Sequence, residues 1–252
     1  MILLSPAKSL RSDFIKPHKH SDIRFPSESQ ELIDLLKDFT NEEIARLMKV
    51  SEAISTENTA RYASYSYPFD EASTPVAIHS FLGDVYKEMK TEYWSVKDLN
   101  FAQKNIRILS GLYGMLRPLD LMHPYRLEMG TRLANNKGPN LYAFWYGKVT
   151  AALNEDIYKG EHTFIVNLAS NEYWTVLQVS ELDVPVYTIH FREMRDEKLK
   201  FISFNAKKAR GMMASYIIAE RVKSVDALKA FDMDGYAFEE EMSSETDLYF
   251  VR

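Results

Sequence analysis

Apolar residues fall in short, separate runs along the chain, and most of these runs have the length of a β-strand. Residues 1–5 begin with four apolar side chains, and residues 163–168 form a run rich in β-branched residues that ends at a polar turn. Both runs predict buried strands. Residues 184–191 and 198–204 flank the turn Arg195-Asp196-Glu197 and predict a β-hairpin, and residues 236–251 predict short strands around an acidic turn.

Other segments place apolar residues at helical spacing behind a residue that can start a helix. Ser27 and Gln30 form a capping-box pattern before a helix through Phe39, and Ser95 caps a helix that reaches toward Ile106. The other predicted helices begin at Asn41, Ser51 (to about Tyr65) and Pro75 (through Met89), and cover residues 141–158, 206–223 and 225–231. Because helices interleave with strands and hairpins, the pattern predicts an α+β fold with a central mixed β-sheet wrapped by helices.

Composition is that of a globular chain. With 252 residues, 46% of them hydrophobic, we expect a single domain over residues 1–252. The lack of cysteine excludes disulfide frameworks, thiol catalysis and iron–sulfur clusters. Residues 1–6 lack the basic region of a signal peptide, and no apolar stretch approaches the roughly 20 residues that span a bilayer. We therefore expect a cytoplasmic protein without a membrane partner.

Charge changes this picture because it is segregated along the chain. The formal net charge is −5, yet residues 104–148 hold seven bases and two acids, and residues 198–223 hold seven bases and one acid. Residues 26–58 and 224–252 are acidic in balance. Two interpretations stay open: ordinary solvated faces, or one basic surface that the two basic segments build for an anionic partner.

The densest candidate segment spans residues 107–122, in which Gly111 and Gly114 stand three apart. A tight Gly-x-x-Gly turn leading into a helix directs free N–H groups at an anion such as a phosphate. The run Leu-Ser-Gly-Leu-Tyr-Gly resembles the hairpin of a helix–hairpin–helix module, whose amides bind a phosphodiester, and Arg107 and Arg117 flank it. The alternative is a structural turn at the end of a strand over residues 106–109.

Two further groups of charged residues are candidates for anion binding. Arg126 and Glu128 share one side of a predicted strand, either as a surface salt bridge or as an arginine held for phosphate or carboxylate. Lys207, Lys208 and Arg210 stand at the start of a predicted helix, where the helix dipole disfavours cations. Helix stability does not explain these three cations, which favours a functional role over a structural one, and Lys207 and Arg210 suit contact with phosphate.

Polar residues also follow the apolar runs of residues 1–5 and 163–168. Lys8 comes just after the first strand and is a candidate nucleophile or base, although a lysine that extends into solvent is the commoner case. Asn167, Ser170 and Glu172 follow the carboxyl end of a predicted strand, where α/β proteins build ligand sites. Ser170 and Glu172 also suit the first turn of a helix.

The six histidines are scattered without the spacing of metal ligands, and the chain has neither a Walker loop nor a Gly-x-Gly-x-x-Gly motif. We therefore expect no resident metal and no cofactor.

Taken together, these segments resemble the YaaA family of peroxide stress resistance proteins. The matching stretches, in family order, are Ile2-Leu-Leu-Ser-Pro-Ala-Lys8, Phe81-Leu-Gly-Asp-Val-Tyr86, residues 107–122, residues 124–130, Leu141-Tyr-Ala-Phe-Trp145, residues 167–173 and Lys207-Lys-Ala-Arg-Gly211. The resemblance implies a cytoplasmic protein of hydrogen peroxide stress that lowers free intracellular iron and so limits Fenton damage. It also implies a basic cleft, a helix–hairpin–helix element and binding to double-stranded DNA. This chain departs from the family pattern at Tyr146, Thr175 and Ser215.

The residues support two functional hypotheses. The first is a non-enzymatic stress protein whose basic cleft binds double-stranded DNA. The second is an enzyme acting on a small phosphorylated or carboxylated substrate in the same cleft, with Lys8, Glu128 and Glu172 as catalytic candidates beside Arg126, Asn167 and Lys207. The candidates for DNA or phosphate binding are Arg107, Gly111, Gly114, Arg117, Arg126, Lys207, Lys208 and Arg210. The polar residues expected in the cleft are Ser5, Asp120, Tyr125, Asn167 and Ser170.

Overall fold

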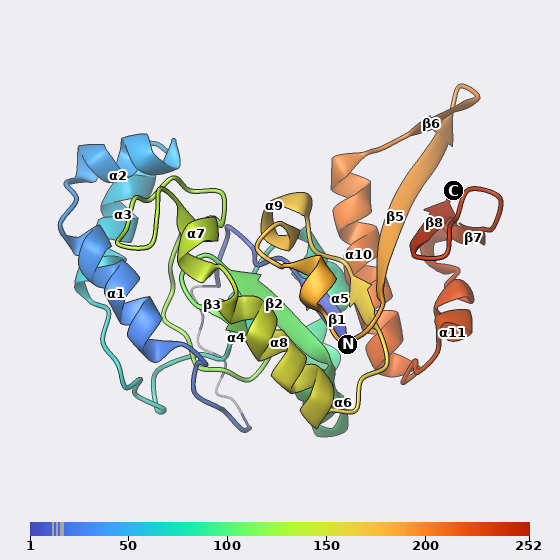
Figure 1. Cartoon of the computed structure of the whole chain (residues 1–252), viewed down its shortest axis with the longest axis horizontal. Coiled ribbons are helices and arrows are strands. Elements are labelled where there is room, and N and C mark those ends of the chain that lie inside the picture. Colours follow the sequence, from blue (N-terminus) through green and yellow to red (C-terminus); the bar gives the residue numbers. More distant parts are fainter. Residues whose placement is uncertain (12, 14, 16–17) are drawn as a thin grey trace.

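The apolar runs form the strands of one mixed β-sheet (Figure 1). The structure is a computed structural model that describes residues 1–11, 13, 15 and 18–252. Within these residues the strand order is β3-β2-β1-β4-β5-β8-β7, with β6 paired to β5. The strands are β1 (Ile2–Leu4), β2 (Ile106–Ser110), β3 (Gly114–Leu116), β4 (Ile165–Asn167), β5 (Val186–Arg195), β6 (Lys198–Lys200), β7 (Ala237–Glu239) and β8 (Asp247–Val251).

Strands β1, β2, β4, β5 and β8 run parallel, whereas β3, β6 and β7 pair antiparallel with their neighbours. The predicted mixed sheet is therefore confirmed. Every residue of β1, β2 and β4 is buried. This burial explains why these strands are almost continuously apolar, since a parallel sheet covered on both faces has no solvent side.

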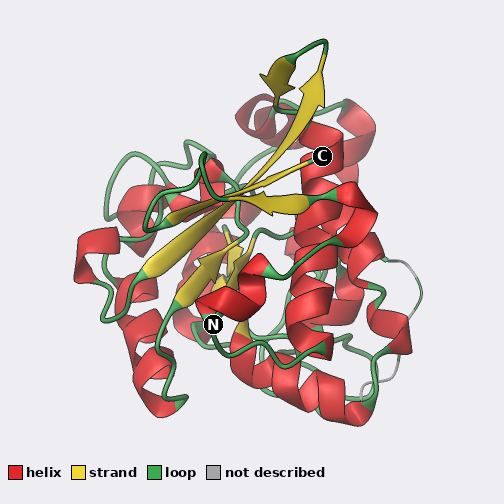
Figure 2. Cartoon of the chain, turned by 90° about the vertical axis from the view of Figure 1, so that its right-hand side faces the viewer, coloured by secondary structure: helices red, strands yellow, loops and turns green. Residues whose placement is uncertain are grey.

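Helices cover both faces of the sheet (Figures 1 and 2). In Figure 1, α8 crosses in front of β2 and β3, while α5 and α6 lie behind, and α10 packs against both of these. The α-helices are α1 (Pro26–Lys37), α2 (Asn41–Met48), α3 (Glu52–Ala63), α4 (Ala77–Ser80), α5 (Asp84–Met89), α6 (Val96–Asn105), α7 (Leu141–Trp145), α8 (Lys148–Lys159), α9 (Asn171–Trp174), α10 (Ser203–Ala219) and α11 (Val225–Lys229).

Some predicted helix starts are right and others are shifted. Ser51 directly precedes α3, and α11 begins at Val225, as predicted. Ser95 caps α6 in a full capping box with Asp98, as its side chain predicts. Helix α2 is capped instead by Thr40, whose hydroxyl accepts from the backbone N–H of Glu43. Ser27 does not cap α1, because that helix already begins at Pro26, whose fixed φ suits the first turn.

Two predicted helices are each broken in two. Residues 75–89 form α4 and α5, separated around Gly83, where an added Cβ would come within 2.8 Å of the Cβ of Ala7. Residues 141–158 form α7 and α8, separated at Gly147, whose φ of +72° a right-handed helix cannot contain. The predicted second strand of the hairpin, residues 198–204, is also too long, since β6 ends at Lys200 and α10 begins at Ser203.

Gly114 and Gly147 form a matched pair for testing how tightly the sheet packs. Both have a left-handed backbone, with φ of +66° and +72°. A Cβ added at Gly114 would lie 2.7 Å from the buried ring of Trp145, whereas the nearest atom to one added at Gly147 is 3.6 Å away. Gly147→Ala should therefore cost only the backbone strain, about 1–2 kcal/mol, and Gly114→Ala about 3 kcal/mol or more in free energy of unfolding.

Urea denaturation of both variants measures this difference. Equal losses at the two positions would show that Trp145 moves aside without cost.

Candidate functional site

The parallel strands create two opposite edges, and the predicted site residues divide between them. Ser5 and Asn167 lie at the carboxyl ends of β1 and β4, whereas Arg107 is the second residue of β2 and lies near its amino end. Carboxyl ends of parallel strands meet along one edge of the sheet. The candidates therefore lie in separate places along the sheet.

The carboxyl-edge site consists of Ser5, Lys8, Tyr125, Arg126, Glu128, Asn167, Ser170 and Glu172. Its centre is Glu128, whose Oε1 lies 3.1 Å from Lys8 Nζ and 3.0 Å from Arg126 Nη2. The Lys8 side chain is 64% exposed, whereas that of Glu128 is only 12% exposed. Arg126 Nε is buried and has no hydrogen-bond partner among the described residues. Glu128 is thus a nearly buried carboxylate between two cations, and one of these, Lys8, still reaches solvent.

Hydroxyl and amide groups surround this ion cluster. Ser5 Oγ donates to Ser170 Oγ at 3.2 Å and accepts from the Ser170 backbone N–H at 2.9 Å. Glu172 Oε1 accepts from the Gly130 N–H at 3.1 Å, which ties α9 to the segment that carries Glu128. Asn167 Oδ1 accepts from the Ala169 N–H at 3.0 Å and so shapes the turn after β4. These contacts bring residues far apart in the sequence to one edge.

Buried tyrosines form the apolar wall of the carboxyl-edge site. Tyr125 and Tyr173 line a cavity of about 10 Å³ together with Lys8, Arg126 and Glu128, a space for about one water molecule. Burial raises the pKa of both tyrosines above its usual value, and the nearby Glu128 raises it further. Their phenols are therefore neutral at physiological pH. Tyr125 shares a hydrogen bond of 2.7 Å with Ser110 Oγ.

The opposite edge holds a groove of about 830 Å³, which we call the amino-edge groove. Five basic and two acidic residues line it, together with His162 and polar or apolar neighbours. The charged residues are Lys104, Arg107, Arg117, Asp156, Lys159, Glu161 and Lys223. Lys104, Lys159 and Lys223 are exposed, and Arg117 is half-buried.

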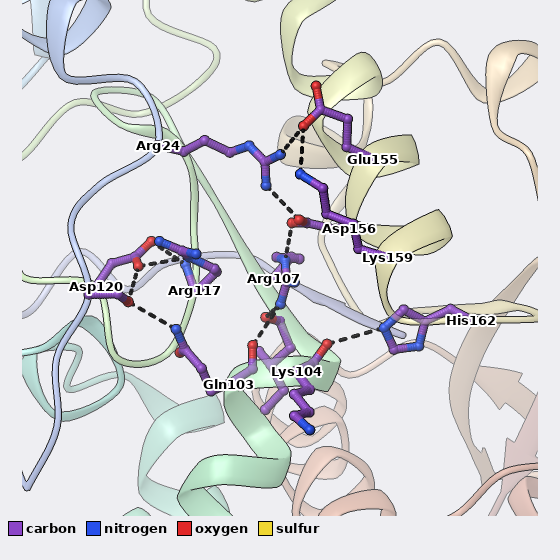
Figure 3. A network of polar contacts seen from close by, with 12 residues as sticks. Arg24, Gln103, Lys104, Arg107, Arg117, Asp120, Glu155, Asp156, Lys159 and His162 are labelled. Atoms are coloured by element: carbon purple, nitrogen blue, oxygen red, sulfur yellow. Dashed lines mark hydrogen bonds and ion pairs between the residues drawn. The ribbon is translucent and has the colours of Figure 1, made fainter.

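A network of ion pairs forms the floor of the groove (Figure 3). Arg107 Nε donates to Asp156 Oδ2 at 2.6 Å, and Arg24 Nη1 donates to Asp156 Oδ1 at the same distance. Burial would raise the pKa of Asp156, but Arg107 and Arg24 outweigh it, and the pKa lies below its usual value. Burial lowers the pKa of His162 to about 4, assisted by the charge of Arg107. His162 is therefore neutral at pH 7, and Asp156 is ionised.

Arg117 and Asp120 form a second pair at the side of the groove (Figure 3). Arg117 Nε donates to Asp120 Oδ1 at 2.9 Å, and the Arg117 backbone N–H donates to Asp120 Oδ2 at 2.8 Å. Asp120 is fully buried, and this burial raises its pKa to about 6 although Arg117 opposes the shift. Asp120 thus lies beside the amino-edge groove rather than among the carboxyl-edge residues.

The glycine turn has a packing role. Gly111 and Gly114 connect β2 to β3, so the turn joins two antiparallel strands and does not lead into a helix. Residues 110–116 are all buried, and a Cβ at Gly111 would lie 2.2 Å from the carbonyl oxygen of Leu127. A phosphate cannot approach amides that are enclosed in this way. Here the structure has a strand–turn–strand unit where we predicted a helix–hairpin–helix element.

The third group of predicted cations lies on α10. This helix begins at Ser203, so Lys207 and Lys208 fall in its second turn, and the argument from the helix dipole at its first turn does not apply to them. Lys208 pairs with Glu88 at 3.5 Å, and the Nε of Arg210 is buried without a partner among the described residues. Arg107 and Arg126 lie at opposite edges of the sheet, so these two residues do not share the predicted site.

The two basic segments nevertheless meet at the amino-edge groove, through Lys104, Arg107 and Arg117 from one segment and Lys223 from the other. Several residues that line this groove were not predicted from the sequence, above all Asp156. An acid among apolar residues on the inner face of α8 is the signal that predicts a buried ion pair there.

In the described part of the chain, no three side chains of His, Asp or Glu lie together as possible metal ligands. No described helix is long and apolar enough to cross a bilayer.

Comparison with known proteins connects this architecture to a family. A family model described as peroxide stress protein YaaA matches residues 1–242. The chain belongs to the peroxide stress protein YaaA family. It is 46% identical to a UPF0246 protein of Saccharophagus degradans and 44% identical to one of Hahella chejuensis, each over 253 residues. Each comparison covers 100% of this chain and 99% of the relative. The resemblance of the sequence motifs to the YaaA family is thus confirmed over nearly the whole chain.

The raised pKa of Asp120 predicts how the stability of this YaaA family member depends on pH. The folded chain binds a proton at Asp120 below about pH 6, whereas the ordinary value is 3.8. Between these values the folded state holds more protons than the unfolded state, so the free energy of unfolding should fall as pH rises through this window. Asp120→Asn should remove that contribution to the slope in urea denaturation between about pH 4 and 6.

Asp156→Asn is the matched control, because the pKa of Asp156 lies below 3.8 and this carboxylate does not titrate in the same window. An Asp120→Asn variant with the slope of the unmodified protein would contradict the raised pKa.

Proposed function

We propose that the protein acts in the peroxide stress response by limiting free iron and Fenton damage, and that it binds double-stranded DNA along the amino-edge groove. The observation that supports DNA binding is the meeting of cations from both basic segments at this groove. The support for the role in peroxide stress is membership in the family.

The groove suits the edge of a phosphate backbone. Lys104 and Lys223 are exposed and form no ion pair among the described residues. Arg107 is buried and paired with Asp156, so it makes the floor of the groove rigid and leaves contact with phosphate to the exposed lysines. Cations that contact phosphates position a protein on DNA without reading bases, so the proposed binding tolerates any sequence.

The role of DNA binding in peroxide stress follows from where Fenton chemistry does harm. The lysines of the groove would compete with iron for the same phosphates, because both are held there by positive charge. Such competition would keep iron away from the DNA and so limit Fenton damage there, and it needs no metal site in the protein.

A salt titration with labelled duplex DNA tests the groove. Each phosphate contact contributes about 0.9 to the slope of log affinity against log salt concentration. Replacing both Lys104 and Lys223 by Ala should weaken binding and reduce this slope by up to about 1.8. Fluorescence anisotropy measures both quantities.

The matched control removes the same charge from Lys37 and Arg46, which are exposed on α1 and α2. Replacing these two residues by Ala should leave the slope within about half a unit of the unmodified value. Equal slopes for the two double variants would contradict the groove as the site, and an unmodified protein without salt-dependent binding would contradict DNA binding itself.

The carboxyl-edge site favours a second candidate function, an enzyme for a small phosphorylated or carboxylated substrate. Its specific support is Glu128, a carboxylate held between Lys8 and Arg126 beside a small cavity. In such an enzyme Glu128 would serve as a general base, and the exposed Lys8 would bind the anionic group of the substrate.

Inorganic phosphate is a simple probe of this second function. If the site binds anions, millimolar phosphate should raise the melting temperature of the unmodified protein, and Lys8→Ala should remove the increase. Lys37→Ala, another exposed lysine, is the control and should retain it. A rise of equal size in Lys8→Ala would place the anion elsewhere.

A further inference from the structure

The outer part of the sheet presents a face that the groove and the carboxyl-edge site do not use. Side chains alternate along β5, so His190 and Arg192 point to one face, whereas Ile189 and Phe191 point to the other and are buried in the core. Tyr249 on β8 is the partner of His190 in the parallel pairing and lies on the same face. All three of these outward side chains are only half-buried.

These side chains form a continuous stack, which we call the ladder face: His190, Arg192, Phe201 and Tyr249. The rings of His190 and Tyr249 are nearly parallel, with centroids 4.5 Å apart and an angle of 18° between their planes. The guanidinium of Arg192 lies 5.7 Å from the centre of the Tyr249 ring and 5.1 Å from that of Phe201. Phe201 ends the stack and is 53% exposed, so one aromatic surface is open to a further ring.

Positive charge continues from the open end of the ladder face. Residues 198–210 contain five bases and no acid. Within this segment Phe204 is also 53% exposed and lies 5.0 Å from Lys208 Nζ. The Nε of Arg210 is buried without a partner among the described residues, and burial together with the nearby charge of Arg192 lowers the pKa of Arg210. Lys200 and Lys208 are paired with Asp196 and Glu88. Arg192 and Arg210, in contrast, repel each other and form no ion pair among the described residues, which favours an anion beside them.

We propose that the ladder face binds single-stranded nucleic acid, with unpaired bases stacked on Phe201 and Phe204 and phosphates on the neighbouring cations. Exposed aromatic rings alternating with cations are how proteins bind unpaired strands without sequence preference. A paired duplex does not offer the faces of its bases to such rings. The proposal is independent of duplex binding at the amino-edge groove.

Two other occupants fit less well. The hairpin of β5 and β6 extends beyond the body of the molecule (Figures 1 and 2), but its tip is Asp196-Glu197, which opposes insertion into an anionic membrane. A second copy of the chain could pair along β6, but that strand has three residues, two of them lysines that would repel their copies. Charge and aromatic exposure together favour an unpaired anionic strand.

A fluorescein-labelled oligothymidylate of about 20 nucleotides is the probe, and anisotropy at low salt is the measurement. Phe201→Ala should weaken binding about tenfold, because one stacking surface is lost. Tyr93→Ala is the control, since Tyr93 is 81% exposed and lies outside the ladder face, and it should bind as the unmodified protein does. Phe201→Trp should retain binding, and the added indole fluorescence should decrease when the oligonucleotide stacks on it.

Duplex DNA distinguishes the two proposals, because Phe201→Ala should leave duplex binding unchanged, whereas the loss of Lys104 and Lys223 should weaken it. Three results would overturn the ladder-face proposal: equal oligothymidylate affinity of Phe201→Ala and Tyr93→Ala, an unchanged indole signal in Phe201→Trp at saturating oligonucleotide, or Phe201-dependent binding to phosphatidylglycerol vesicles without binding to the oligonucleotide.

Discussion

Arg107 imposes a constraint on which the arrangement of the sheet and its groove depends. It is a cation on β2, a strand whose residues are all buried, and an unpaired charge at that depth would cost several kcal/mol. Asp156 on α8 supplies the compensating charge, and Arg24 completes the network from the segment before α1. The pair fixes how α8 lies on the sheet, and it leaves a rigid charged floor on which a groove can be built.

The buried centre of the sheet also decides where chemistry can occur. Because β1, β2 and β4 are covered on both faces, polar side chains can gather only where these strands end. The carboxyl edge gathers Lys8, Glu128 and their neighbours around a cavity of about one water, whereas the amino edge opens into a far larger groove. The same strands thus separate a tight, largely neutralised cluster from an open surface with free cations.

The sequence predicted the strands better than the placement of the site. The strand within residues 163–168 could be predicted because burial on both faces requires an apolar run. The start of α6 at Ser95 could be predicted because a capping box involves only residues close together in the sequence. Gly147 gave no such signal, since only its left-handed backbone shows that the helix must break there. Arg107 and Asn167 were predicted in one cleft. Arg107 lies near the start of β2 and Asn167 at the end of β4, and because these strands run in the same direction the two residues lie at opposite edges of the sheet. The acid partner of Arg107 is about 50 residues away in the sequence, and only packing brings it close.

The position of β1 has a consequence for synthesis of the chain. This strand lies between β2 and β4, so its pairing partners are residues 106–108 and 166–167. At roughly 5–20 residues per second, the ribosome needs on the order of ten seconds to add β4 after it has made β1. During that interval the apolar residues of β1 lack one of their two partner strands. The centre of the sheet therefore closes only after about 160 further residues have been added, which makes its pairing a late step of folding.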